Sequence, residues 1–202
     1  MTIGFAILGP GIVADHNHKP AIEANADLGA RLIATAHHNP AKFSQFSEQF
    51  GVPCQSYEDV LANPDVDVIC ICTPSGQHAK QTIAAAQAGK HVLVEKPMAL
   101  SLADADAMIE ACDKAGVKLG VTFQRRYEPY FSRIHQAIEA GDFGDLTLGV
   151  VTIPYHRPQD YFNLADWRGT WALDGGGVLM NQGIHLVDLL VWYMGDPVDI
   201  QA

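Results

Sequence analysis

Short apolar runs alternate with helix-like segments through the first 123 residues, and this alternation constrains the fold more than any other feature. The runs are uninterrupted, as in strands buried on both faces of a sheet, whereas the segments between them carry apolar residues at helical spacing. The predicted strands are Ile3–Leu8, Arg31–Ala36, Val66–Cys72, His91–Val94 and Val117–Phe123. The predicted helices are Val13–Ala24, Ala41–Phe50, Tyr57–Ala62, Gln77–Ala88 and Leu102–Ala115, the last with Ser101 as its N-cap. This order predicts an α/β fold built on a doubly wound parallel sheet.

The alternation stops after Phe123, which indicates a second unit. A helix is predicted over Pro129–Ala140, then a strand over Leu146–Tyr155 and an aromatic, charged loop to Asp174. A glycine triplet precedes a last helix, which begins near Val178.

Composition excludes several classes of protein. The net charge of −10, without any run of Lys or Arg, argues against a nucleic-acid partner. The late apolar stretch contains Asn181, His185 and Asp188, which are too costly to scatter through a membrane span. The amino terminus lacks the pattern of a signal peptide, so we predict a cytoplasmic protein. The four cysteines form no C-x-x-C pair and are interpreted as packed thiols.

The segment from Gly9 to Ala14 reads G-x-G-x-x-A and lies between the first strand and the first helix. Glycine at the first two positions permits a tight turn and a close approach of backbone to a pyrophosphate, and the helix N-terminus favours negative charge. We therefore predict a nicotinamide dinucleotide site of the Rossmann type. Its candidate contacts here are Gly9, Gly11, Ile12 and Val13.

The second strand ends in His37-His38 rather than in the acidic residue that usually binds the adenosine ribose. Without a carboxylate, a 2′-phosphate is not repelled, and a histidine can bond to one, so both NAD and NADP stay open. The alternative is that both histidines are solvated loop residues.

Two side chains are candidates for proton transfer. Lys96 directly follows a buried strand, where desolvation lowers the pKa of an amine. His185 shares a helix face with Asn181 and Asp188, so an amide, an imidazole and a carboxylate lie in line. In function Asn181 would bond a substrate hydroxyl; the alternative is a polar stripe with a structural role. No metal is predicted, because the histidines near His16 lack acidic or cysteine partners at ligand spacing.

Long motifs along the whole chain resemble the Gfo/Idh/MocA oxidoreductase family. They comprise the segments 66–78, 88–97, 126–129, 167–170 and 175–188. The resemblance implies that Glu95 and Lys96 close the cofactor site beside the nicotinamide and that Thr73, Pro74 and His78 border it. It also implies cofactor contacts from Gln124, Trp167 and Arg168, and substrate contacts from Lys96, Arg126, Asn181 and His185. The segment from Arg157 to Thr170 is most similar to 3-dehydrogenases of UDP-N-acetylglucosamine-type sugars and their uronic acids.

The resemblance implies a Rossmann domain over residues 1–123 and the incomplete start of an α+β substrate domain over 124–202, since family members continue for a long further stretch. Asn181 stands where many members carry aspartate. The expected activity is hydride transfer between a sugar or sugar-nucleotide alcohol and NAD or NADP, by a homo-oligomer. Two alternatives are an NAD-dependent glycosidase of the same fold and a non-catalytic dinucleotide-binding module.

Overall fold

The structure, a computed structural model, describes residues 2–201 and divides into two compact units. Unit 1 is Met1–Thr122 and unit 2 is Phe123–Ala202. Each unit is described by itself. No helix within the described residues combines the length and the apolar character needed to cross a bilayer.

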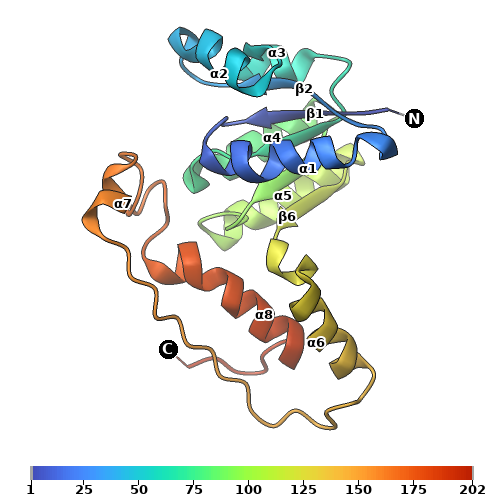
Figure 1. Cartoon of the computed structure of the whole chain (residues 1–202), viewed down its shortest axis with the longest axis vertical. Coiled ribbons are helices and arrows are strands. Elements are labelled where there is room, and N and C mark those ends of the chain that lie inside the picture. Colours follow the sequence, from blue (N-terminus) through green and yellow to red (C-terminus); the bar gives the residue numbers. More distant parts are fainter. Residues whose placement is uncertain (1, 202) are drawn as a thin grey trace. The chain divides into compact units, whose positions relative to one another are not determined.

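Unit 1 contains a six-stranded parallel sheet in the order β3-β2-β1-β4-β5-β6 (Figure 1). The strands are β1 (Ile3–Leu8), β2 (Ala30–Ala36), β3 (Cys54–Gln55), β4 (Val68–Ile71), β5 (His91–Glu95) and β6 (Leu119–Thr122). This order is that of the dinucleotide-binding Rossmann fold, in which ligands bind beyond the carboxyl ends of the strands where the winding reverses. The reversal here lies between β1 and β4, which confirms the predicted fold class.

Helices cover both faces of this sheet. Side chains of α1 (Lys19–Ala24) and α2 (Phe43–Phe50) pack with Ile7 and Cys70 on one face. On the other face, α3 (Tyr57–Ala62), α4 (His78–Gln87) and α5 (Leu102–Ala115) pack around Ala6, Leu8 and their neighbours on β4 and β5. Successive residues of a strand point to opposite faces of the sheet, so the central strands are buried on both faces.

Local sequence signals account for several boundaries. The Ser101 hydroxyl accepts a hydrogen bond from the Asp104 amide at 3.1 Å, which confirms Ser101 as the N-cap of α5. The two-residue strand β3 was missed, because so short a segment carries no periodicity. Shorter turns complete the unit: η1 (Ala14–His18, a π-helical turn), η2 (Ala26–Leu28), η3 (Pro40–Lys42) and η4 (Ser75–Gln77).

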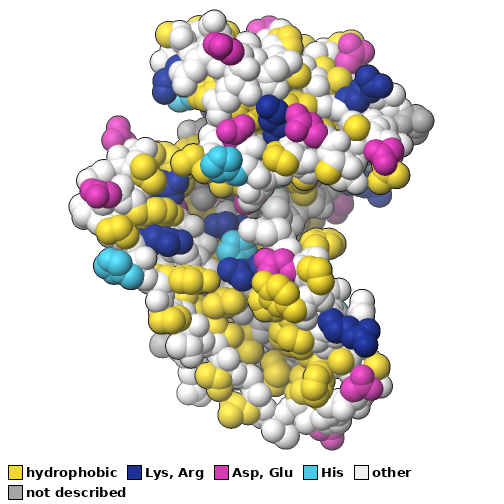
Figure 2. All heavy atoms as spheres, viewed as in Figure 1, with side chains coloured by type: hydrophobic (Ala, Val, Ile, Leu, Met, Phe, Trp, Pro, Cys, Tyr) yellow, Lys and Arg dark blue, Asp and Glu magenta, His cyan; other side chains and the backbone are white. Residues whose placement is uncertain are grey.

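The regular elements among the described residues of unit 2 are all helical. Its elements are η5 (Gln124–Tyr127), α6 (Pro129–Glu139), α7 (Gln159–Asn163), the π-helical turn η6 (Leu179–Gly183) and α8 (Ile184–Met194). The predicted strand over Leu146–Tyr155 is wrong: the segment forms no strand, since no described strand of unit 2 offers it backbone hydrogen bonds. Helix α7 was not predicted. Apolar side chains lie on the exposed surface of this unit (Figure 2). The exposed large apolar residues of the unit include Leu148, Val150 and Val198.

Candidate functional site

The two glycines of the turn after β1 play different parts. Gly9 has φ +83°, and a Cβ there would lie 2.8–2.9 Å from side-chain and backbone atoms of Thr73 and Cys72. Its amide also donates to the Ala36 carbonyl at 3.0 Å. A Cβ at Gly11, in contrast, would meet no atom within 4 Å. The fold therefore needs glycine at position 9, whereas the space at Gly11 is open, as the predicted approach of a pyrophosphate to the backbone requires.

The helical segment that follows this turn is buried against the sheet at Ala14 and exposed to solvent at the two preceding residues. Ala14 is fully buried against the sheet beside Ile7. Ile12 and Val13 are 58% and 42% exposed. These exposed apolar side chains stand in the first turn, where the sequence predicts cofactor contacts.

His37 stands directly after β2, where an acidic residue usually binds the adenosine ribose. The Asn39 amide donates to His37 Nδ1 at 3.0 Å, so the neutral ring carries its proton on Nε2. Burial lowers the pKa of His37, and the charges of His38 and Lys42 lower it further, whereas the Asn39 carbonyl oxygen, 3.4 Å from Nδ1, favours the charged ring and raises it. The ring stacks on His38 at 4.3 Å between centroids and lies 5.0 Å from the Phe46 ring. The site thus presents an uncharged N–H where a carboxylate usually accepts.

Thr73 and Pro74 follow β4 at the carboxyl edge of the sheet, and α4 fixes this segment. The Thr73 hydroxyl donates to Gln81 Oε1 at 2.6 Å, and both residues are buried. The ring of His78, which is 1% exposed, lies against the Thr73 carbonyl with Nε2 at 2.9 Å. Burial lowers the pKa of His78, opposed by its contacts with the Pro97 and Thr73 carbonyls.

Glu95 and Lys96 follow at the end of β5, next to β4 in the sheet. The Glu95 carboxylate lies 2.9 Å from His18 Nε2, and the side chains of the pair are only 12% and 6% exposed. His18 comes from η1, the π-helical turn after the glycine turn. Sequence reasoning weighed His18 only as a metal ligand, together with His16, and rejected it. Its place in the helical turn directly after the glycine motif is the signal that could have pointed to a role near the cofactor. The predicted cofactor residues of unit 1 therefore lie along one edge of the sheet.

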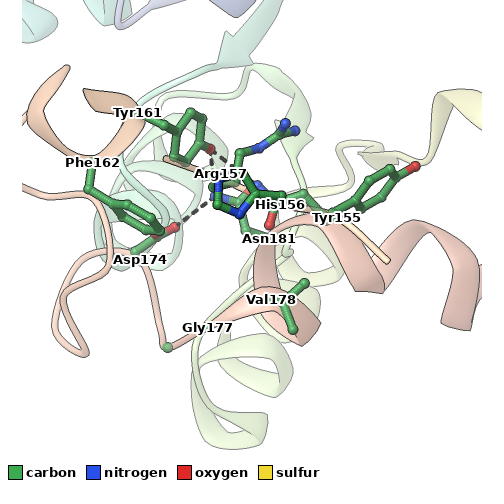
Figure 3. Close-up of a pocket in the computed structure, with 11 residues that line it drawn as sticks. Tyr155, His156, Arg157, Tyr161, Phe162, Asp174, Gly177, Val178 and Asn181 are labelled. Atoms are coloured by element: carbon green, nitrogen blue, oxygen red, sulfur yellow. Dashed lines mark hydrogen bonds between the residues drawn. The ribbon is translucent and has the colours of Figure 1, made fainter. Parts of the chain in front are cut away.

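Unit 2 contains a pocket of about 320 Å³ (Figure 3). Its lining is the segment Tyr155–Arg157, Tyr161 and Phe162 of α7, Asp174, Gly176–Val178, and Asn181 and Gln182 of η6. The Tyr161 hydroxyl is the centre of a polar cluster: it accepts from Arg168 Nη1 at 2.7 Å, Asn181 Nδ2 at 3.2 Å and Gln182 Nε2 at 3.3 Å. Tyr161 and Arg157 were not among the predicted site residues, although both lie in the aromatic, charged loop.

Cations surround the aromatic wall of this pocket. The Arg157 guanidinium lies 5.0 Å from the Tyr161 ring centroid, and the Arg168 guanidinium lies 4.5 Å from it. The Arg168 guanidinium also lies 4.8 Å from the Trp167 ring centroid. Trp167 and Arg168, two of the residues predicted to contact the cofactor, therefore belong to this cluster. Asp174 is buried, and it accepts from the Gly169 amide at 2.7 Å and from Asn181 at 3.4 Å. Asn181 is thus held at the wall by Tyr161 and Asp174.

His185 is buried on α8, and its ring meets the edge of Phe123 at 6.3 Å between centroids. The carboxylate of Asp188, one turn further along α8, accepts from Arg126 Nε and Nη2 at 2.8 and 2.6 Å. Arg126, predicted to bind substrate, is therefore paired, and Asp188 raises the pKa of its guanidinium. Gln124 is exposed at the start of the same turn, η5.

Comparisons with known proteins cover both units. An oxidoreductase family with an NAD-binding Rossmann fold matches residues 3–123, and the GFO/IDH/MocA C-terminal domain matches residues 131–202. Inositol 2-dehydrogenase of Rhizobium meliloti (strain 1021) is 31% identical over 100% of the chain and 58% of that relative.

Among solved structures, the WlbA dehydrogenase from Bordetella pertussis in complex with NADH and UDP-GlcNAcA is 40% identical. It superposes with a TM-score of 0.90 over 96% of this chain and 56% of that one. WlbA from Chromobacterium violaceum, also with NADH and UDP-GlcNAcA, is 40% identical with a TM-score of 0.89. The chain spans little more than half the length of these relatives.

Proposed function

Because the chain belongs to the Gfo/Idh/MocA oxidoreductase family, we propose that it takes part in oxidising a secondary alcohol of an acidic sugar nucleotide such as UDP-GlcNAcA. Unit 1 would bind the nicotinamide dinucleotide, and unit 2 would bind the sugar. The NADH and UDP-GlcNAcA in the WlbA structures support both assignments.

The observation that carries the substrate class is the cationic, aromatic pocket of unit 2. Arg157 lines it, and Arg168 lies on Tyr161 in its wall. Asp174 is the one carboxylate in the lining, and its oxygens are occupied by Gly169 and Asn181. With Arg157 in the lining and Arg168 against Tyr161, two guanidinium groups stand near this one carboxylate, which favours an anionic ligand although the chain has a net charge of −10. Arginine suits this ligand because its guanidinium bonds carboxylates and phosphates in pairs.

The reaction needs a base for the hydroxyl proton and groups that orient the alcohol. A bound nicotinamide would accept the hydride. We assign the proton to Lys96 or His185, and the orientation of a hydroxyl to the Asn181 amide, which Tyr161 and Asp174 hold in place. The uncharged N–H of His37 can donate to a ribose hydroxyl or to a 2′-phosphate, so NAD and NADP are both candidates.

Calorimetry with UDP-GlcNAcA and with UDP-GlcNAc, which keeps the diphosphate but lacks the sugar carboxylate, tests the substrate class. Arg157→Met should weaken UDP-GlcNAcA binding by roughly 10- to 100-fold, the range for a hydrogen bond to a charged group. The loss should be smaller for UDP-GlcNAc if Arg157 meets the carboxylate. Arg133→Met, at an exposed position of α6, is the control. Equal affinities of the wild-type chain for both ligands would contradict the acidic substrate.

Product analysis tests the reaction. Net oxidation accumulates reduced cofactor, whereas a glycosidase of this fold releases free sugar without net redox change. In a form that turns over, Lys96→Met and His185→Ala should each lower turnover by roughly 10²–10⁴-fold, the range for general acid–base catalysis. Full activity of His185→Ala would leave Lys96 as the candidate base. The homo-oligomeric state and the cytoplasmic location stay predictions from the sequence.

A further inference from the structure

One buried histidine joins the two loops that follow β4 and β5. His78 Nδ1 lies 2.8 Å from the Pro97 carbonyl oxygen, and Nε2 lies 2.9 Å from the Thr73 carbonyl oxygen. Pro97 directly follows Lys96, and Thr73 follows β4. A single side chain of α4 therefore bridges the backbone of the predicted cofactor loop and the backbone beside the lysine.

The burial of His78 limits what else it can do. The residue is 1% exposed, so it offers almost no surface to a dinucleotide or a substrate. Both of its nitrogens face carbonyl oxygens, which only accept hydrogen bonds. A neutral imidazole satisfies one of these oxygens, and an imidazolium satisfies both. In either form both ring nitrogens lie against the backbone of the two loops, so neither is left to contact a ligand.

The backbone on the N-terminal side of Lys96 is anchored as well. Glu95 precedes it, and its carboxylate is paired with buried His18 at 2.9 Å. Thr73 is fixed a second time by α4, since its hydroxyl donates to Gln81 at 2.6 Å. The residues on both sides of Lys96 are thus anchored by histidines from two different helical segments.

We propose that His78 is a positioning residue for Lys96, acting through the Pro97 carbonyl, rather than a residue that touches the cofactor. This inference rests on the proposed function only for the role of Lys96. The anchoring itself is a property of unit 1 and can be measured without turnover.

Hydrogen exchange read by mass spectrometry tests the anchoring on the full chain. In His78→Leu, which offers no donor, amides of the segment 95–100 should exchange roughly 10- to 100-fold faster, as expected for the loss of a buried hydrogen bond. Amides of β1 and β4 should keep wild-type rates. His78→Gln, which retains an N–H donor, should restore part of the protection. Thr82→Val is the control, because Thr82 is buried one turn further along α4 and its hydroxyl has no hydrogen-bond partner.

The outcomes separate positioning from general stability. Unchanged exchange of 95–100 in His78→Leu would overturn the proposal, and so would equal acceleration in β1 and β4. If His78→Leu does not fold, His78→Gln decides by the same comparison, since it should give intermediate exchange confined to 95–100.

A double-mutant cycle then links the anchoring to catalysis in a form that turns over. His78→Leu should lower kcat with little change in the KM for the dinucleotide, and it should have no further effect in a Lys96→Met background. Additive losses would contradict action through Lys96. If Lys96→Met is fully active, the proposed role of Lys96 is wrong. The hydrogen-exchange measurement then still decides whether His78 anchors the segment 95–100.

Discussion

Replacing Gly9 by alanine should destabilise unit 1 because its methyl group would collide with neighbouring atoms. The new Cβ would stand 2.8 Å from the Thr73 methyl carbon and 2.9 Å from the Cys72 oxygen and the Thr73 nitrogen. The φ of +83° adds a second cost, about 1–2 kcal/mol for a left-handed L-residue. Displacing packed neighbours costs about 1–3 kcal/mol more. We therefore expect a loss of about 2–5 kcal/mol in the free energy of unfolding.

Gly11→Ala is the matched control, two residues along the same turn. Its Cβ would meet no atom within 4 Å, so the free energy of unfolding should change by less than about 0.5 kcal/mol. The methyl group would instead occupy the space through which a pyrophosphate approaches the backbone. Fluorescence titration with NADH should therefore show weakened binding by a chain of normal stability.

The assay must report on unit 1, because Trp167, Trp171 and Trp192 all lie in unit 2. Urea unfolding followed by far-UV circular dichroism, with hydrogen exchange of β1 and β4 peptides, meets this need. With an m-value of about 2 kcal/mol/M, the Gly9→Ala midpoint should fall by about 1–2.5 M. A wild-type midpoint for Gly9→Ala, or a large loss for Gly11→Ala, would refute the reasoning.

Three further predictions concern other parts of the chain. His37→Asp should shift the NADH-to-NADPH affinity ratio towards NADH, because a carboxylate repels a 2′-phosphate; an unchanged ratio would count against this role. Burial raises the pKa of Cys70 to about 12 and that of Cys72 well above its ordinary value, so both stay protonated at mildly alkaline pH. A thiol reagent should label them only after unfolding, and rapid native labelling would disprove this. Arg126→Met leaves the Asp188 carboxylate unpaired and should cost unit 2 about 1–3 kcal/mol, measured by tryptophan fluorescence.

The fold of unit 1 was predictable because its signals are local. Buried parallel strands are continuous apolar runs, and Ser101 and the glycines mark where elements begin and end. The doubly wound parallel arrangement followed from this alternation, because few topologies accommodate it. The order of the six strands, with β3 at one edge, came from the structure. The strand predicted over Leu146–Tyr155 failed for the complementary reason: an apolar run becomes a strand only where another strand supplies hydrogen bonds.

The contacts around the site were decided by tertiary structure. His18 and Glu95 are 77 residues apart, and Arg126 and Asp188 are 62 apart, so no spacing rule connects them. The sequence alone predicted that Lys96 follows a strand and that Asn181 and His185 lie in one helical segment, which the structure divides into η6 and α8. Only the folded chain determined that His78 bridges two carbonyl oxygens and that Asn181 donates a hydrogen bond to Tyr161, because each pairing depends on where distant segments meet.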